Sequence, residues 1–185
     1  MDLGANALQL MGKVNTLLLE HAIVKRPWRI GFSASTGRKV PIYRWLAERL
    51  RSVGVPILAL PGNHDDAAAL AAAIPNCATD LPVSFANDHW RVLGLNSAVP
   101  GAIPGGLSAA TLSELDAQLA GDDRPALVAL HHQPVPVSSP WIDRYPLLEP
   151  GALWAVLSRH AAVRAVCWGH IHHAFETEVD GIRAL

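Results

Sequence analysis

The sequence of 185 residues lacks several features that would point to particular classes of protein. It has only two cysteines, Cys77 and Cys167, which are too few for the disulfide framework of a small secreted domain. It also has little net charge, formally -1, which argues against a strongly basic nucleic-acid binder and a polybasic membrane anchor. We therefore expect a small-molecule partner, no nucleic acid and no membrane, and the sequence gives no indication of oligomeric state.

Signals for export and for membrane insertion are missing as well. Residues 1–5 contain no basic segment that leads into an apolar run, and nowhere do about 18 apolar residues follow one another without interruption. Together with the low cysteine content, this predicts a cytoplasmic protein. The chain is 50% hydrophobic and 17% charged, and at this length a single domain buries roughly two thirds of its unfolded surface. A metal would therefore serve function and not stability.

Acidic residues are absent from one long stretch. Residues 21–47 contain six basic residues and no Asp or Glu. Within this stretch, residues 29–39 have neither helical nor strand periodicity and predict a loop, for which a solvated basic segment and a functional one are equal alternatives. We interpret residues 1–42 as an atypical N-terminal segment that a shifted reading frame or an incorrect gene start would explain. Residues 43–185 are interpreted as the folded domain.

From residue 43 onward, helix-like and strand-like patterns alternate at short spacing. Leu46, Leu50 and Val53 recur at helical spacing, and Asp66 can cap the alanine-rich residues 67–73. Apolar runs of strand length occupy residues 55–60, 90–95, 126–130 and 163–168, and helical patterns follow Ser108 and span residues 153–160. Because strands alternate with helices, we expect an α/β domain with buried, largely parallel strands.

Histidines gather at the ends of three of the expected strands. Six of the nine histidines fall in these clusters, namely His64, His131, His132, His170, His172 and His173. In α/β sheets, ligands collect beyond the carboxyl ends of the strands. Three strand ends that carry imidazoles within one small domain therefore predict a single site of converging titratable groups.

The three clusters offer different chemistry. Asn63 offers a neutral oxygen to a hard metal, and His64 offers a ligand or a proton donor. The adjacent histidines after residues 126–130 point to opposite faces while the chain is extended, so only one of them can bind a metal in a given site. His170 and His172 share one face of an extended segment, which suits a transition metal. The simpler alternatives are an Asx turn and solvent-exposed histidines.

These residues resemble the motifs of the calcineurin-like metallophosphoesterases. The matching segments are Gly62-Asn63-His64-Asp65, His131-His132 with Pro134, and Gly169-His170-Ile171-His172, in the family's order and approximate spacing. Within that superfamily the chain is most similar to the bacterial 3',5'-cyclic AMP phosphodiesterases, through residues 58–65, 131–136, 141–143 and 167–173. The resemblance runs from about Tyr43 to Leu185. It implies a four-layer α/β/β/α sandwich, so that residues 43–185 would be a metallophosphoesterase-like domain.

The resemblance also implies a hydrolase with a metal site. The reaction would be hydrolysis of a phosphodiester, 3',5'-cyclic AMP or a related cyclic nucleotide, by attack of a metal-bound hydroxide. The cofactors would be divalent transition metals, iron or manganese, two of them in the family. Carried over to this sequence, Asn63, His131 and His170 would bind one metal and His172 the other.

Residues that touch the substrate follow from the same resemblance. Asn63, His64 and His172 would contact the substrate, and His64 would be the catalytic residue that helps to protonate the leaving oxygen. His132 and His173 have no counterpart among the family's ligands. We expect these two to support the site from behind or to lie at the surface.

Two motifs of the family are missing from this sequence. The family has an early Asp-x-His and a Gly-Asp-x-x-Asp whose first aspartate bridges the metals, but Asp2 has no histidine two residues on, and no acid lies between Glu20 and Glu48. The remaining ligands are neutral, so no carboxylate offsets the repulsion between two close dications. We therefore expect at most one tightly held metal. We also expect an incomplete sandwich, because the family continues beyond the point that corresponds to Leu185.

Two other functions stay open beside the metal-dependent phosphodiesterase. One is a non-catalytic remnant or binding module of the same fold, which the missing aspartates favour. The other is a phosphoesterase with another substrate, such as a phosphoprotein, a phospholipid or a nucleic-acid end. Nothing in the three clusters selects the base of a nucleotide, so the choice of substrate depends on the resemblance alone.

Overall fold

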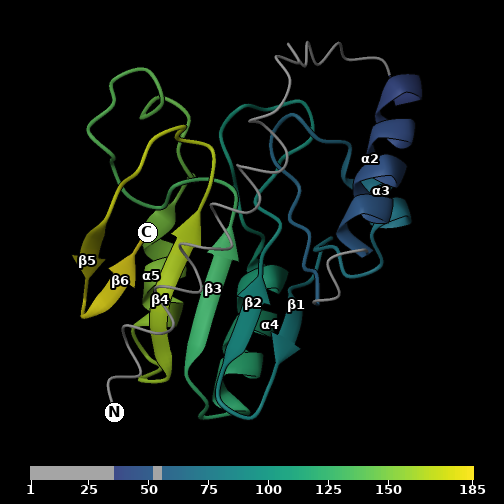
Figure 1. Ribbon diagram of the computed structural model, residues 1–185. Helices are drawn as coiled ribbons and strands as arrows, with labels where there is room; N and C mark the ends of the chain where they lie inside the picture. The colour runs from purple at the N-terminus through teal and green to yellow at the C-terminus, as the bar shows by residue number, and fades with distance from the viewer. Residues whose placement is uncertain (1–35, 52–55) are drawn as a thin grey trace. The chain divides into compact units, whose positions relative to one another are not determined.

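Figure 1 shows the structure, a computed structural model that describes residues 36–51 and 56–185. In chain order, its elements are α2 (Thr36–Arg51), α3 (Ala67–Ala73), β1 (Val83–Ala86), β2 (Arg91–Gly94), α4 (Ala109–Ala120), β3 (Ala126–Leu130), α5 (Pro150–Leu157), β4 (Val163–Trp168), β5 (Thr177–Val179) and β6 (Ile182–Ala184). Within these residues, none of the helices is both long and apolar enough to span a bilayer. Val53 and residues 29–35, on which two expectations fall, lie outside the described residues.

The strands form one six-stranded sheet in the order β1-β2-β3-β4-β6-β5. β2, β3, β4 and β6 pair in parallel, and the edge strands β1 and β5 pair antiparallel with their neighbours. This confirms the α/β class and the largely parallel strands. The second sheet of the four-layer sandwich is not among the described residues.

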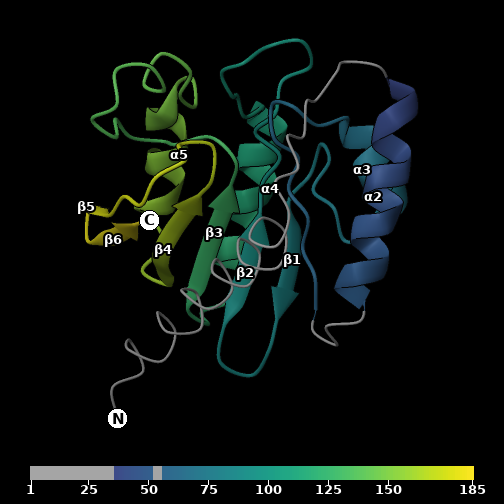
Figure 2. The same ribbon diagram turned by 45° about the horizontal axis from the view of Figure 1, so that its top comes forward.

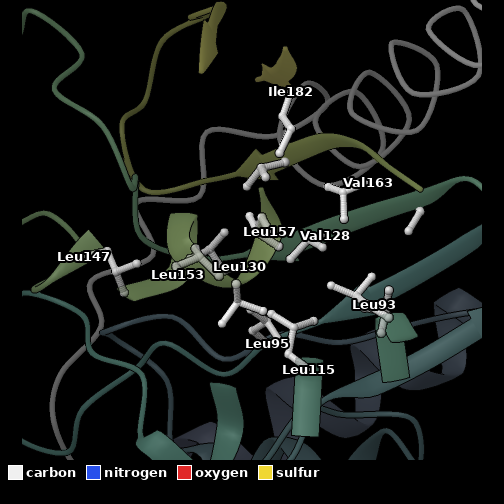
Figure 3. Packing of buried hydrophobic residues seen from close by; sticks show 14 residues of the cluster. Leu93, Leu95, Leu115, Val128, Leu130, Leu147, Leu153, Leu157, Val163 and Ile182 are labelled. Atoms are coloured by element: carbon white, nitrogen blue, oxygen red, sulfur yellow. The ribbon is translucent and has the colours of Figure 1, made fainter. Parts of the chain in front are cut away.

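The main hydrophobic core fills the space between the sheet and two helices. Leu115 of α4 and Leu157 of α5 pack against Leu93, Val128 and Leu130 of the strands (Figure 3). Figures 1 and 2 show α4 and α5 on the same face of the sheet. Each fully buried aliphatic side chain contributes about 1.5–3 kcal/mol, and a slip of one residue in β3 would turn Val128 and Leu130 out of this core. The core therefore fixes the register in which β3 reaches the residue that follows Leu130.

Several elements agree with the sequence expectations. α3 spans Ala67–Ala73, and the Asp66 side chain caps it by accepting a hydrogen bond of 3.0 Å from the backbone N–H of Ala69. α4 begins after Ser108, whose hydroxyl accepts from the backbone N–H of Thr111 at 3.0 Å. β3 and β4 have the predicted bounds. These segments were predictable because a cap residue or an apolar run of strand length defines each of them.

Two expectations about the region before α3 were wrong. The apolar residues 56–60 do not form a strand, and only Ala59 makes an isolated parallel bridge, with Cys77. Prolines at 56 and 61 have no N–H to donate, which limits this segment to a short pairing. Residues 36–39 belong to α2 and not to a loop. Their composition gave no periodicity, but a helix propagates cooperatively from its anchored part, where Tyr43 and Ala47 are buried.

Both cysteines carry free thiols. Cys167 lies in β4, where burial raises the pKa of its thiol to about 11. Cys77 faces Ala59 across the isolated bridge, and burial likewise raises the pKa of its thiol above the usual value. Neither thiol is therefore in the ionised form that binds metals or attacks electrophiles.

Candidate functional site

The carboxyl ends of β3 and β4 bring two of the predicted histidines together. The two strands pair in parallel with Leu130 opposite Trp168, so His131 and His170 leave the sheet at the same edge. The backbone N–H of Gly169 donates to the carbonyl of His131 at 3.2 Å, which ties the two strand ends together just beyond the sheet. The edge on which the sequence predicted a site is therefore formed by adjacent strands.

Three predicted metal ligands converge at this edge. The Nε2 atom of His131 lies 3.1 Å from Oδ1 of Asn63 and 3.1 Å from Nδ1 of His170. Gly62 makes this approach possible, because a Cβ at position 62 would lie 2.7 Å from Cε1 of His131. The structure thus brings together the three residues that were expected to share one metal. We refer to Asn63, His131 and His170 as the donor trio.

Two separations within the donor trio are of the size that a single transition-metal ion requires. Ligand atoms about 2.1 Å from an ion, at angles between octahedral and tetrahedral, lie about 3.0–3.4 Å from one another, and His131 lies 3.1 Å from each of the other two donor atoms. Two imidazole nitrogens and one amide oxygen are ligands that such ions accept. All three are neutral. The carboxylate closest in sequence, that of Asp65, accepts hydrogen bonds from Gly62 N and from the Tyr43 hydroxyl.

The imidazoles of His131, His132 and His170 stay neutral at neutral pH, so each keeps one nitrogen with a lone pair. Burial lowers the pKa of His131 to about 3, with further lowering by neighbouring histidines, beginning with His132 and His170. Burial also lowers the pKa of His132 to about 4 and lowers that of His170. A metal competes with protons for the imidazole lone pair, so these shifts keep the nitrogens available as ligands.

His132 is buried next to the site and does not lie at the surface, which leaves the first of the two alternatives expected for it. Its ring is fully buried, and its ligand atoms lie within 4.8 Å of those of His131 and His170. Its Nε2 lies 3.0 Å from the carbonyl oxygen of Ile103, which can only accept, so Nε2 carries the proton. Its Nδ1 then accepts from the hydroxyl of Ser97 at 2.8 Å. Because both ring nitrogens have partners, His132 is not available as a ligand.

Ser97 holds the end of β3 in place. It is fully buried, and its hydroxyl oxygen accepts hydrogen bonds of 3.2 Å from the backbone N–H groups of both His131 and His132. The same hydroxyl donates to the His132 ring. Gly105 leaves room for that ring, because a Cβ there would lie 2.3 Å from its Nδ1. Ser97 therefore fixes the backbone from which the His131 side chain reaches the donor trio.

The turn that carries Asn63 and His64 is closed by its own residues and by α2. The carboxylate of Asp65 accepts from the backbone N–H of Gly62 at 2.8 Å and from the hydroxyl of Tyr43 at 2.8 Å. The Tyr43 oxygen accepts in turn from the backbone N–H of Asp66 at 3.0 Å. Burial raises the pKa of Tyr43 above its usual value, so the hydroxyl remains a donor. These bonds present the two residues at the tip of the turn to the site.

His64 and His172, the residues assigned to the substrate and the second metal, are exposed. Both lie close enough to His131 that their positive charge would lower its pKa. They therefore lie within electrostatic range of His131 and are open to solvent. His173 is exposed as well, and its Nδ1 lies 2.8 Å from the carbonyl oxygen of Ile171.

The expectation that His170 and His172 share one face of an extended segment was wrong. Both residues adopt left-handed backbone conformations, with φ of 66° and 59°. Ile171 between them is buried and packs against Val137 and Ile142. This packing turns the chain, so that His170 enters the donor trio while His172 is left exposed. Positive φ is uncommon for residues other than glycine, and conformations held in this way cluster at functional sites.

Two residues that build the site were not predicted from the sequence. Ser97 follows β2 as His131 follows β3, so the rule that polar residues gather at strand ends would have found it. Tyr43 had no such signal, because its bond to Asp65 joins residues 22 positions apart through the packing of α2.

Comparisons with known proteins identify the family. The family model of the calcineurin-like phosphoesterases matches residues 33–174. A 3',5'-cyclic-nucleotide phosphodiesterase of Nostoc sp. is 38% identical over 144 residues, which cover 77% of this chain and 54% of that one. The 3',5'-cyclic adenosine monophosphate phosphodiesterase CpdA of Pseudomonas aeruginosa is 34% identical, over 74% of this chain and 52% of that one. The chain thus spans about half the length of these relatives.

A solved structure shares the fold. The dimetal phosphatase from Danio rerio superposes with a TM-score of 0.60 at 17% sequence identity, covering 76% of this chain and 66% of that one. At this identity the likeness concerns the fold alone. The family model, in contrast, matches most of the residues of the chain. The chain therefore belongs to the calcineurin-like phosphoesterase family.

Proposed function

We propose that this chain is a metal-dependent phosphodiesterase that hydrolyses 3',5'-cyclic AMP or a related cyclic nucleotide. The observation that carries the proposal is the donor trio, in which Oδ1 of Asn63 and Nδ1 of His170 both lie 3.1 Å from Nε2 of His131. The names of the relatives support the choice of a cyclic nucleotide as substrate. The free thiols of Cys77 and Cys167 support a cytoplasmic location as part of the same proposal.

In this proposal the donor trio holds one divalent transition metal, iron or manganese. When bound, such an ion polarises a phosphoryl oxygen and lowers the pKa of a coordinated water. Asn63 contributes an oxygen. His131 and His170 contribute the lone-pair nitrogens of imidazoles that burial keeps neutral. His172 lies beside the trio and is assigned to a second ion or to the phosphate.

The exposed residues at the site are assigned to the substrate. His64 stands at the tip of the turn that Asp65 closes, where a substrate can reach it. An imidazole donates and accepts protons near neutral pH, so we assign His64 the protonation of the leaving oxygen. The Asn63 side chain has two further N–H donors on its amide nitrogen, and these are suited to a phosphate oxygen.

The proposal is tested by metal analysis together with hydrolysis. The full chain is loaded with manganese and dialysed, and its metal content is measured alongside hydrolysis of cyclic AMP and of bis-p-nitrophenyl phosphate. We expect one tightly held ion per chain and release of 5'-AMP. Two stoichiometric ions would point to ligands beyond the donor trio, and hydrolysis of neither compound would reject the phosphodiesterase.

A binding module of the same fold is the second candidate. It is favoured by one observation, namely that no member of the donor trio is a carboxylate. A chain of this kind would bind manganese and 5'-AMP but would not turn over cyclic AMP. A phosphoesterase with another substrate would instead hydrolyse bis-p-nitrophenyl phosphate and leave cyclic AMP intact.

We further propose that residues 43–185 are the metallophosphoesterase-like domain and that residues 1–42 are an N-terminal segment substituted in the part before residue 33, where the family model begins. The absence of any acid between Glu20 and Glu48, where the family's bridging aspartate would stand, supports this proposal. The coding DNA tests it directly. If no alternative reading frame across codons 1–42 encodes Asp-x-His and Gly-Asp-x-x-Asp, the explanation by a shifted frame is wrong.

A further inference from the structure

Trp141 exposes its indole ring beside the candidate site. The residue is 54% exposed, and the centroid of its ring lies 6.0 Å from that of His172, with the two ring planes inclined by 53°. Covering the faces of an aromatic side chain of this size removes apolar surface from water and so lowers the free energy. Trp141 thus offers an apolar surface next to a residue that we assign to the metal or the phosphate.

The loop that carries Trp141 is held firmly. The carboxylate of Asp143 accepts from the backbone N–H groups of Val137 at 2.9 Å and of Ser139 at 3.0 Å. The side chain of the buried Gln133 donates to the carbonyl of Ile142 at 3.0 Å. A ring on a backbone fixed in this way loses little conformational freedom when a ligand covers it.

A small hydrophobic cluster sets Trp141 and His172 side by side. Ile142, Ile171 and Val137 are buried together. Trp141 precedes Ile142 in the chain, and His172 follows Ile171, so contact between the two isoleucines brings the two rings together. The turn of the chain at residues 170–172 that places His170 in the donor trio therefore also places His172 beside the indole.

We propose that Trp141 is the platform on which the base of the substrate stacks. This inference rests on the phosphodiesterase function proposed above and deepens it, since it names the residue that favours nucleotides over phosphodiesters without a base. Aromatic side chains stack with any nucleobase, because every base has a π-face. Trp141 is therefore assigned affinity for the base without selection among bases.

The position of Trp141 matches the shape of a nucleotide. In a compact cyclic nucleotide the phosphate and the base lie at opposite ends of one ribose. His172 lies beside the Trp141 ring and follows by two residues His170 of the donor trio, which is the phosphate end of the proposed site. A substrate with its phosphate at the trio can therefore reach the indole with its base.

Trp45 provides a matched control. It is 53% exposed, almost the same as Trp141, but it lies on α2, where the guanidinium of Arg49 stands 5.7 Å from the centroid of its ring. Replacing Trp45 by alanine removes an equally exposed indole that has no place in the proposed site.

The test measures binding of two product-like probes to the manganese-loaded full chain by calorimetry. The probes are 5'-AMP and ribose 5-phosphate, which lacks the base. We expect Trp141→Ala to raise the Kd for 5'-AMP roughly 5- to 150-fold, the range that corresponds to stacking of one base, and to leave the Kd for ribose 5-phosphate within about twofold. Trp141→Phe should have a smaller effect on 5'-AMP, and Trp45→Ala should match the unchanged chain for both probes.

Three outcomes would overturn the assignment. The first is an equal change for both probes, and the second is no change for 5'-AMP. The third is loss of 5'-AMP affinity together with an altered sedimentation coefficient, because Trp141 would then belong to an interface between chains. The proposed function fails separately, if the unchanged chain binds 5'-AMP through Trp141 but hydrolyses neither cyclic AMP nor bis-p-nitrophenyl phosphate.

Discussion

The candidate site contains two sets of side chains that differ in how they are held. His131 and His170 leave adjacent parallel strands, have lowered pKa values and meet at 3.1 Å. His64 and His172 stand on turns and are exposed to solvent. Donor atoms that are fixed in place and carry a free lone pair favour binding of a cation, whereas a substrate must be able to reach the groups that contact it. The difference therefore separates the residues that we assign to a metal from those that we assign to a phosphate.

The largest effect should follow from removing the centre of the donor trio. His131→Ala deletes the nitrogen that both other donors face, so we expect affinity for manganese to fall by more than about 100-fold, beyond the usual cost of losing an outer-shell partner. Hydrolysis should be lost with it. Calorimetric titration with manganese measures the effect, and His89→Ala, at an exposed histidine between β1 and β2, is the control. Full occupancy at unchanged affinity would remove His131 from the metal site.

Removing a member of the exposed set should have a different effect. His64→Ala should lower turnover of cyclic AMP by about 10²- to 10⁴-fold, the usual contribution of a general acid, while metal content stays as it was. Steady-state rates and elemental analysis of the same preparation check both parts. If His64→Ala strips the metal, the two sets have been assigned the wrong way round.

Ser97 tests whether the fixed position of His131 matters for metal binding, because its hydroxyl bonds the backbone of His131 and not a ligand atom of the donor trio. Ser97→Ala leaves the N–H groups of His131 and His132 without an acceptor, and we expect manganese to bind about 10- to 100-fold more weakly. Ser108→Ala is the matched control, because it removes the cap of α4 and costs about 1 kcal/mol of stability without reaching the site. If both variants lose stability but neither loses manganese affinity, Ser97 is only a structural residue.

A further effect concerns the pH dependence of stability in the metal-free chain. The pKa values of His131 and His132 are lowered to about 3 and about 4, so on unfolding each takes up a proton at pH values between its folded and unfolded pKa. Stability is therefore fully present above about pH 6.5 and falls toward about pH 4, by about 1.4 kcal/mol per pH unit for each histidine. Urea unfolding with a chelator present measures this slope.

A matched pair of variants tests how much of that slope comes from His131. His131→Gln should flatten it by about 1.4 kcal/mol per pH unit, because one titrating group is removed. His89→Gln, at an exposed position, should leave it unchanged. Equal slopes in the two variants would show that burial does not suppress protonation of His131.

Local patterns in the sequence were sufficient for much of the fold, whereas the members of the donor trio were named from the resemblance to the family. The bounds of β3 and β4 follow from apolar runs, and the start of α3 follows from the capping side chain of Asp66. Because parallel strands end at a common edge, the polar residues that follow them could be placed together from the sequence.

What could not be predicted depends on packing between distant segments. Residues 56–60 look like a strand, but their pairing partner is limited to Cys77 at one bridge. The conformation of residues 170–172 depends on contact between Ile171 and Ile142, which are far apart in sequence. Tyr43 reaches the site only because α2 packs near the turn that it fastens. No local periodicity encodes contacts of this kind.

The thiol of Cys167 has a practical consequence for following how this molecule opens. Burial in β4 raises its pKa to about 11, so at neutral pH it holds much less thiolate than an ordinary cysteine, and alkylating reagents attack the thiolate. Modification by iodoacetamide should therefore wait until β4 separates from its neighbours. The rate of alkylation, measured by mass spectrometry, would then report how often β4, the strand that leads to His170, separates from its neighbours. A ligand that closes the site should lower this rate.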